Sequence, residues 1–337
     1  MKKIIFLETT NQEQEICQKY PDFFKNVDFS SEKLTLENVK KFKDYEIVSI
    51  FIGSNVSADV LKELENLKFI ATRSTGFDHI DLNYCKEKEI LVSNVPTYGS
   101  HTVAEYTFAL LLCLIRKVYN SYQRIRETGS FSLEGLRGEE LFGKTIGIIG
   151  TGRIGTEVIK IAKGFSMNVI AYDKYPKEEL AQELDFKYVS LEELLSQSDI
   201  ITLHVPHNKE THHLLNKDNL SKTKKGVYII NTARGGIIET QALYRALKDG
   251  QVGGAALDVL EEEGDLKEEQ RILLEKENIP PEKLRILLAN HIFIDLDNVI
   301  ISSHNAFNTK EALENIFITT MENIENYLKG KPINLVN

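Results

Sequence analysis

The chain has 337 residues, of which 42% are hydrophobic and 27% charged, and its formal net charge is −9 at pH 7. This length predicts two domains, because single hydrophobic cores rarely grow beyond about 250 to 300 residues. The negative charge argues against a protein that binds nucleic acid or a membrane surface, since either partner favours a basic face.

The cysteines and the apolar runs indicate the compartment. Cys17, Cys85 and Cys113 are an odd number for a disulfide framework and lack the CxxC spacing of zinc sites. The N-terminal apolar run is too short for a secretory signal. The longest apolar run, 108–115, is too short to span a membrane. We therefore expect a cytoplasmic protein.

Residues 1–97 alternate between strand-like and helix-like segments. Short apolar runs predict strands at 4–7, 47–52, 69–72 and 91–95. Between the strands lie amphipathic segments such as 58–67, whose apolar residues recur at helical spacing. The alternation predicts a small parallel sheet covered by helices, without a glycine-rich phosphate loop.

Two turns of this first domain have features beyond simple connection. Thr75 and Gly76 follow the third strand, where backbone N–H groups beside a glycine can form a nest for a carboxylate. Taken alone, an ordinary turn from a strand to a helix is the simpler interpretation of this stretch. Pro96 ends the last strand, so the chain is expected to leave the domain at about residue 97.

The segment 101–115 is apolar around nearly its whole circumference. This pattern predicts a helix buried between the two domains, and it is a candidate dimer element. The next segment, 116–126, is basic and polar with helical character, so its charges are expected to face solvent. Residues 129–143 resemble a loop that leads into the second domain.

The most informative stretch is 143–173, GKTIGIIGTGRIGTEVIKIAKGFSMNVIAYD. The β-branched run 145–149 predicts a strand buried on both faces, and it ends in a glycine-rich turn. Apolar residues at helical spacing follow this turn, and a second strand is predicted at 168–172. The stretch is therefore a strand, turn, helix and strand unit.

This unit has the chemistry of a dinucleotide site. Gly150 permits a tight turn, Gly152 lets backbone N–H groups approach a pyrophosphate, and Gly155 lets the helix pack closely on the strand. Asp173 lies about twenty residues further on, where a carboxylate can accept both ribose hydroxyls. A carboxylate there repels a 2′-phosphate, so the stretch predicts NAD rather than NADP. Three glycines in an ordinary loop are the alternative, which the flanking strand, helix and acid argue against.

The remaining segments complete the second domain. Strands are predicted at 200–205, 227–232, 255–260 and 299–302, and helices at 191–197 and 240–248. With the strands at 145–149 and 168–172 they make six, the number of a full dinucleotide-binding sheet. The cofactor domain is therefore predicted at 98–301.

Two segments stand outside this repeat. The charged stretch 261–297 is either a functional lid or an irregular insertion, and prolines divide it into predicted helices at 270–276 and 282–289. A long amphipathic helix at 310–328 is expected to pack back on the first domain. The first domain is therefore predicted to be discontinuous, from 1–97 and 302–337.

Reactive side chains follow three of the predicted strands, where ligands bind in doubly wound sheets. Arg234 lies between a strand end and two glycines, and a guanidinium there could hold a carboxylate through two parallel hydrogen bonds. Four acids lie within 258–263, and His304 follows the last strand. A neighbouring glutamate would favour the charged imidazole, which is a natural proton donor. Each residue alone has a structural alternative, but together they predict one catalytic cleft.

Four histidines in the segment LHVPHNKETHH raise the possibility of a metal site. His204, His207, His212 and His213 match no common zinc signature, and the adjacent pair would diverge on a strand or a helix. We therefore expect no metal. Three other residues of the same stretch are expected to line the cofactor cleft instead: Val205, Pro206 and Thr211.

The motifs resemble those of the D-isomer-specific 2-hydroxyacid dehydrogenase family over essentially the whole chain. The resemblance is carried by STGFDHIDL, NVPTYGSHTVAEYTFALLL, GKTIGIIGTGRIG, HVPHNKETHHLLN, IINTARGGIIET, GAALDVLEEE and SSHNAFNTKEAL. The run YQRIRETGSFSLEGLRGEELFGKT is similar to the fermentative D-lactate dehydrogenase branch. The resemblance implies an α/β protein with two doubly wound parallel-sheet domains, a Rossmann NAD-binding domain inserted into a flavodoxin-like substrate domain.

The resemblance also implies roles for single residues. Arg234 would bind and orient a keto-acid carboxylate, His304 would be the acid and base, and Glu263 would pair with His304. Of three successive glutamates, only Glu263 stands at the family's position. Thr75 and Gly76 would hold the substrate carboxylate through backbone amides, with Tyr98 nearby. The positions that match NAD-contacting residues are Arg153, Ile154, Asp173, Val205, Pro206, Thr211, Thr232, Ala233 and Asp258.

The chain departs from the family around the histidine. The family usually has a proline before it, where this chain has Ser303. The lactate branch usually continues with Thr-Ala-Phe-Tyr, where this chain has Asn305, Ala306, Phe307 and Asn308. Loss of the tyrosine leaves a smaller and more polar wall, so we expect lactate not to be the only good substrate.

The resulting prediction is a dehydrogenase that uses NADH to reduce a 2-keto acid reversibly to its D-2-hydroxy acid. The keto acid is either pyruvate or a larger or more polar one. Closure of the two domains would exclude water, and the resemblance favours a homodimer. A 3-phosphoglycerate dehydrogenase-like enzyme is one alternative, but no basic cluster lies near Tyr98. A non-catalytic NAD-sensing protein is another, although it would not require Arg234, Glu263 and His304 together.

Overall fold

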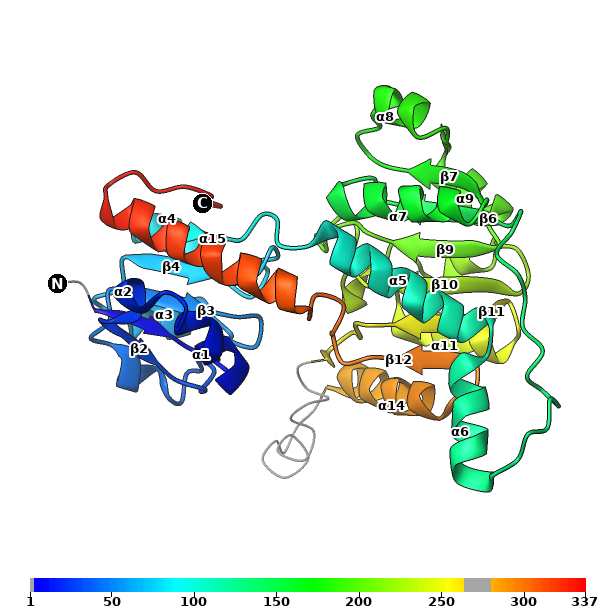
Figure 1. The fold of residues 1–337 in the computed structure, drawn as a ribbon, viewed down its shortest axis with the longest axis horizontal. Coiled ribbons are helices and arrows are strands. Elements are labelled where there is room, and N and C mark those ends of the chain that lie inside the picture. The colour runs from blue at the N-terminus through cyan, green and yellow to red at the C-terminus, as the bar shows by residue number, and fades with distance from the viewer. Residues whose placement is uncertain (1–2, 264–279) are drawn as a thin grey trace. The chain divides into compact units, whose positions relative to one another are not determined.

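The computed structural model describes residues 3–263 and 280–337. The chain divides into two compact units (Figure 1). Unit 1 contains Met1–Gly99 and Asn308–Asn337, and unit 2 contains Ser100–Phe307. Both boundaries lie slightly further along the chain than the predicted 97 and 301. The second boundary has a local cause, because backbone N–H groups of Asn305 and Ala306 donate to the Asp258 carboxylate and hold this segment to unit 2.

The sheet of unit 1 is parallel, with the strand order β2-β1-β3-β4-β5. This is the flavodoxin-like order that the family resemblance implies. Strand β2 is absent from the prediction because only Val27 of its three residues is buried, so it leaves no apolar run. The strands are β1 Ile4–Phe6, β2 Val27–Phe29, β3 Ile47–Ile50, β4 Phe69–Thr72 and β5 Leu91–Ser93.

Helices cover both faces of this sheet. The helices from the first segment of the chain are α1 Asn11–Cys17, α2 Pro21–Phe24, the 3-10 helix η1 Val39–Phe42, α3 Ala58–Lys62 and α4 Leu82–Glu87. One face packs against η1, α3 and α4, whereas the other packs against α1, α2 and the C-terminal helix α15, Lys310–Leu328. The rings of Phe317 and Phe6 stack 6.2 Å apart, and those of Tyr327 and Phe69 stack 4.3 Å apart. The C-terminal helix therefore completes the core of unit 1.

The sheet of unit 2 has seven parallel strands in the order β12-β11-β10-β9-β6-β7-β8. The order reverses between β6 and β9, as in a Rossmann fold with one added strand. The sequence predicts six strands, and it misses β8 because this strand has two residues and neither is buried. The strands are β6 Thr145–Ile149, β7 Asn168–Tyr172, β8 Lys187–Tyr188, β9 Ile200–Leu203, β10 Val227–Asn231, β11 Val252–Leu257 and β12 Val299–Ile301.

Two hydrophobic clusters lie on opposite faces of this sheet, and neighbouring strand residues such as Ile229 and Ile230 point into different clusters. Helices α5, Ser100–Ile115, and α7, Arg153–Gly164, cover one face (Figure 1). The buried side chains of α5 thus pack within unit 2, where Phe108 stacks on Phe165. The other helices are α6 Val118–Thr128, α8 Glu178–Glu183, α9 Leu191–Gln197, α10 Lys217–Leu220, η2 Gly235–Ile237, α11 Thr240–Lys248 and α14 Pro281–Asp295.

The charged stretch 261–297 is partly described. The predicted helix at 270–276 lies outside the described residues. The helix predicted at 282–289 is α14, which continues to Asp295. Leu284, Leu288 and Ile292 are exposed on this helix, whereas Leu287 and Phe293 are buried. Because apolar residues occupy both its exposed and its buried positions, their spacing does not indicate where the helix ends. Within the described residues, no helix is both long and apolar enough to span a membrane.

Candidate active site

The glycine-rich turn joins β6 to the N-terminus of α7. Gly150 has a φ of +98°, a left-handed conformation that favours glycine. A Cβ atom on Gly155 would lie 1.9 Å from the carbonyl oxygen of Gly150, so helix and turn approach more closely than any side chain permits. A Cβ atom on Gly152 would meet nothing within 4 Å. The protein therefore leaves the space beside Gly152 open, as close approach of a ligand to the backbone requires.

Asp173 lies at the end of β7, beside this turn. Its Oδ2 atom accepts hydrogen bonds from the backbone N–H of Thr151 at 2.7 Å and from the Thr151 hydroxyl at 3.0 Å. Its Oδ1 atom accepts the backbone N–H of Tyr175 at 2.9 Å. These bonds orient the carboxylate next to the glycine-rich turn, which is the arrangement that an adenosine ribose requires.

Other predicted cofactor residues follow neighbouring strands of the same sheet. Val205 and Pro206 follow β9, Thr232 and Ala233 follow β10, and Asp258 follows β11. The Thr211 hydroxyl donates to the carbonyl oxygen of Pro206 at 2.6 Å and so closes the loop after β9. Because all these strands are parallel, these residues gather at one edge of the sheet.

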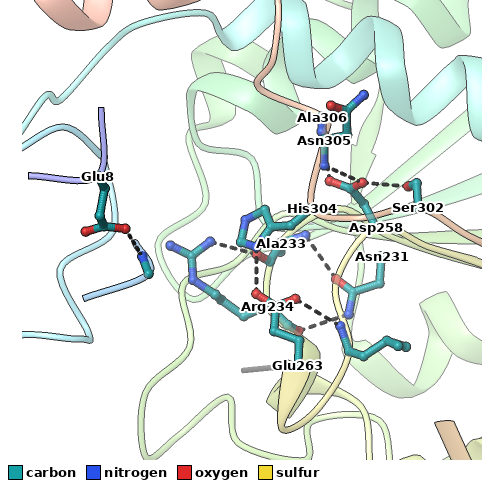
Figure 2. Close-up of polar contacts among 12 residues, drawn as sticks. Glu8, Asn231, Ala233, Arg234, Asp258, Glu263, Ser302, His304, Asn305 and Ala306 are labelled. Carbon is teal, nitrogen blue, oxygen red and sulfur yellow. Dashed lines mark hydrogen bonds and ion pairs between the residues drawn. The ribbon is translucent and has the colours of Figure 1, made fainter. Parts of the chain in front are cut away.

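His304 and Glu263 form an ion pair at this edge, with Nδ1 of His304 2.7 Å from Oε1 of Glu263 (Figure 2). The side chain of His304 is 15% exposed and that of Glu263 is 32% exposed. The pair is therefore sheltered but still reachable from solvent. A carboxylate on Nδ1 fixes the ring orientation and leaves Nε2 as the nitrogen that can exchange a proton with a ligand.

Asp258 holds the backbone around His304. Its carboxylate accepts the Ser302 hydroxyl at 2.5 Å and the backbone N–H groups of Asn305 and Ala306 at 2.8 and 2.9 Å (Figure 2). Its main-chain oxygen accepts the backbone N–H of His304 at 2.8 Å. Asp258 is 1% exposed, so these bonds are shielded from water.

Arg234 stands at the end of β10, just before η2. The side chain of Asn231 braces this turn, because its Oδ1 atom accepts the N–H of Ala233 and its Nδ2 atom donates to the carbonyl oxygen of Arg234 (Figure 2). Nη1 of Arg234 donates to the carbonyl oxygen of Ala233 at 2.8 Å. Strands β10, β11 and β12 are neighbours, so Arg234 and the His304–Glu263 pair follow adjacent parallel strands.

The residues predicted to bind a substrate carboxylate, Thr75, Gly76 and Tyr98, belong to unit 1. The Thr75 hydroxyl donates to the carbonyl oxygen of Val95 at 2.8 Å, and Asn94 donates to the carbonyl oxygen of Thr75 at the same distance. Within the described part of the chain, the backbone N–H groups of Thr75 and Gly76 have no acceptor. Two hydrogen bonds thus hold the turn, and its backbone offers two donors. Asn315 donates to the carbonyl oxygen of Tyr98.

The four histidines considered as metal ligands interact with one another and with neighbouring side chains. His204 is partly buried, its Nε2 atom lies 2.9 Å from the Thr202 hydroxyl, and desolvation lowers its pKa to about 3. Nε2 of His207 lies 3.1 Å from Nδ1 of His212, whose ring stacks on that of His213. In residues 3–263 and 280–337, no group of three or more histidine, cysteine or acidic side chains is arranged to hold a metal ion.

Some residues that build the site are absent from the sequence prediction. Asn231 braces the Arg234 turn, and Glu261 forms an ion pair with His213. Asn231 at a strand end is a signal that sequence reasoning could have used, because asparagine often bonds to a following turn. Glu261 gives no such signal, since its partners come from distant segments.

The chain matches the family model described as D-isomer specific 2-hydroxyacid dehydrogenase, NAD binding domain, over residues 108–306. It is 39% identical over 334 residues to a 2-hydroxyacid dehydrogenase homolog of Zymomonas mobilis, covering 98% of each chain. It is 38% identical over 333 residues to the D-lactate dehydrogenase of Escherichia coli, again covering 98% of each.

Solved structures show the same likeness. The apo-structure of D-lactate dehydrogenase from Escherichia coli has a TM-score of 0.83 at 36% identity and covers 100% of each chain. The D-lactate dehydrogenase of Aquifex aeolicus complexed with NAD and lactic acid has a TM-score of 0.83 at 36% identity, covering 97% of this chain and 96% of that one. These likenesses extend over both units.

Proposed function

This chain belongs to the D-isomer-specific 2-hydroxyacid dehydrogenase family, and from that premise we propose that it reduces a 2-keto acid reversibly to the D-2-hydroxy acid. The family makes it an NAD-dependent oxidoreductase. The observation that carries the proposal is the His304–Glu263 ion pair, whose two residues follow β12 and β11, and β11 pairs with β10, the strand that leads to Arg234. This set supplies a proton donor and a carboxylate-binding guanidinium.

The residues of unit 2 fit the cofactor. The backbone beside Gly152 is open, the N-terminus of α7 presents N–H groups, and Asp173 lies at the end of the next strand. We expect the pyrophosphate at this N-terminus and the adenosine ribose at Asp173. When bound, NADH supplies the hydride that reduces the carbonyl carbon.

Three side chains of unit 2 carry the protein's part of the reaction. In the direction of reduction, His304 donates a proton from Nε2 to the carbonyl oxygen, and Glu263 stabilises the charged ring through Nδ1. Arg234 holds the carboxylate of the keto acid and stabilises the negative charge that develops on the carbonyl oxygen. In unit 1, Thr75, Gly76 and Tyr98 remain proposed as substrate-binding residues.

The substrate proposal covers pyruvate and larger or more polar 2-keto acids. Asn308 stands where the lactate branch usually has a tyrosine, which favours a more polar partner for the substrate side chain. We also propose that the protein is a cytoplasmic homodimer. All three cysteines are free thiols, and burial raises the pKa of Cys17 and of Cys85 to about 11, so these two thiols are protonated at neutral pH.

The test is NADH oxidation with a panel of 2-keto acids, from pyruvate to phenylpyruvate and including a phosphorylated one. We expect turnover of at least one acid, and a fall in kcat/KM of about a hundredfold or more in Arg234→Ala. Arg245→Ala is the matched control, because Arg245 is exposed on α11 and should leave the rate within about twofold. Tight NADH binding without turnover of any acid would instead indicate an NAD-sensing protein.

A further inference from the structure

Glu261 stands two residues before Glu263, and all of its side-chain and main-chain oxygens bind other elements. Its carboxylate is 11% exposed, and Oε1 lies 2.7 Å from Nε2 of His213. Oε2 accepts the Thr240 hydroxyl at 2.6 Å and the Thr240 backbone N–H at 3.3 Å, at the start of α11. Its main-chain oxygen accepts Nδ2 of Asn290, on α14, at 2.9 Å. Three separate segments of unit 2 therefore hold one glutamate that the reaction itself does not use.

The backbone at Glu261 also touches the turn that carries Arg234. A Cβ atom built on Gly235 would lie 2.0 Å from the carbonyl carbon of Leu260 and 2.3 Å from the backbone nitrogen of Glu261. The two backbones are thus in direct contact. His213 strengthens this contact, because its own N–H donates to the carbonyl oxygen of Gly236 at 2.9 Å.

The next two residues connect Glu261 to the proton donor. Glu262 has a φ of +57°, a left-handed conformation that costs a non-glycine residue about 1 kcal/mol or more. Such a conformation persists only where neighbouring contacts enforce it. Glu263 then turns back, so that Oε2 accepts the N–H of Leu260 at 3.4 Å while Oε1 holds His304. The position of Glu263 therefore depends on how firmly its preceding residues are held.

We propose that Glu261 is a positioning residue for proton transfer. With His213, Thr240 and Asn290 it fixes residues 260–263, so that Glu263 stays on Nδ1 of His304 and the Arg234 turn keeps its register against them. Lys283, which lies 3.4 Å from Glu262, adds an exposed ion pair that is not needed for this role. The inference rests on the proposed function, since it assigns a part in the same reaction.

The first experiment compares Glu261→Ala and Glu261→Gln with the matched control Glu262→Gln. We expect kcat to fall about tenfold or more in Glu261→Ala and less in Glu261→Gln, with the KM for NADH within about twofold. The upper pH midpoint of the reduction rate should move to lower pH, because a displaced Glu263 no longer stabilises the charged ring. Glu262→Gln should change none of these. A loss of thermal stability alone, with kcat and the pH midpoint unchanged, would overturn the proposal.

A double-variant comparison tests whether Glu261 acts through Glu263. In a Glu263→Gln background, Glu261→Ala should lower kcat by a clearly smaller factor than in the wild type, because the ion pair with His304 that it positions is already gone. An undiminished effect in that background would show an independent role and refute the proposal. Should Glu261→Ala fail to fold, His213→Asn removes the same ion pair and is subject to the same two outcomes.

A third readout does not require turnover, so it separates this proposal from the proposed function. A charged imidazole whose Nδ1–H is held by a carboxylate gives a proton resonance far downfield, and His304→Asn identifies it by its loss. This resonance should be present in the wild type and in Glu262→Gln. At the same pH it should broaden or vanish in Glu261→Ala. Its persistence in Glu261→Ala would refute the positioning role, whereas absent turnover in the wild type would refute only the proposed function.

Discussion

His304 has a φ of +54°, a left-handed conformation that is uncommon for any residue but glycine. The bonds from its own N–H and from the next two N–H groups to Asp258 enforce this conformation. The imidazole is therefore directed by its backbone as well as by Glu263. Strain of this kind concentrates at active sites, where it preorganises a reacting group.

His204 gives a prediction about pH and stability. Burial lowers its pKa to about 3, below the unfolded value of about 6.5, so its neutral ring contributes stability above about pH 6.5 that is lost as the pH falls towards 3. In His204→Gln this loss should be absent. From about pH 6 to about pH 4, the free energy of unfolding of the wild type should fall relative to the variant by about 1.4 kcal/mol per pH unit.

Urea unfolding at several pH values measures this difference. The variant should be less stable than the wild type at neutral pH, because it loses the packing of the partly buried imidazole ring. The free energies of unfolding of the two proteins should then converge as the solution becomes more acidic, because only that of the wild type includes the loss from His204. Parallel pH dependences would mean that His204 is not held neutral in the folded protein.

The two adjacent glycines after Arg234 differ in what surrounds them, and this predicts different effects of alanine. A Cβ atom on Gly235 would meet the backbone of Leu260 and Glu261, which cannot move without displacing Glu263. A Cβ atom on Gly236 would meet the ring of His207 at 2.8 Å, and a side chain can turn away. We expect Gly235→Ala to cost about 1–3 kcal/mol of stability and to lower kcat about tenfold or more.

Gly236→Ala is the matched control, with a cost of about 1 kcal/mol or less and kcat within about threefold. Thermal unfolding and steady-state kinetics of both variants make the comparison. Equal effects of the two substitutions would contradict the close packing of the Arg234 turn on residues 260–261.

Elements with strict local requirements could be predicted from the sequence. Helices α9, α11 and α15 have the predicted bounds, and the β6–α7–β7 unit follows from its glycines and β-branched runs. Strands β2 and β8 could not be predicted, because they are short and few of their side chains are buried. Helix α3 ends at Lys62, before the predicted 67, although Leu64 and Leu67 remain buried in a turn.

The candidate site likewise contains residues that the sequence indicates and residues that it does not. Arg234 and His304 are candidates because they follow predicted strands, and Glu263 is a candidate because it stands at the position of the glutamate in the family that the motifs resemble. Glu261 could not be singled out in advance, because three consecutive glutamates are chemically identical in the sequence. Only the contacts with His213, Thr240 and Asn290, from distant segments, distinguish it.

The proposed homodimer is a prediction about the whole molecule. Apolar side chains are exposed on α6 and on the segment that follows it, and Phe131 and Leu133 are each 83% exposed. Such a surface favours association with another protein surface. Light scattering should therefore give a mass of about twice the 38.4 kDa of one chain.

The variant Phe131→Ser/Leu133→Ser tests whether this surface is responsible. It should shift the mass towards a single chain, whereas a substitution at Tyr175, an exposed residue after β7, should not. A wild type with the mass of one chain at micromolar concentration would refute the homodimer.

The order in which the ribosome makes the two units has a consequence for folding. Unit 2 is one continuous segment, but unit 1 needs residues from both ends of the chain. At about 5–20 residues per second, the roughly 200 residues between these parts take about 10–40 s to synthesise. During that time Phe6 and Phe69 lack their stacking partners from α15. The nascent first segment is therefore expected to remain protease-sensitive until the last helix emerges, and to be a substrate for chaperones that bind exposed apolar segments.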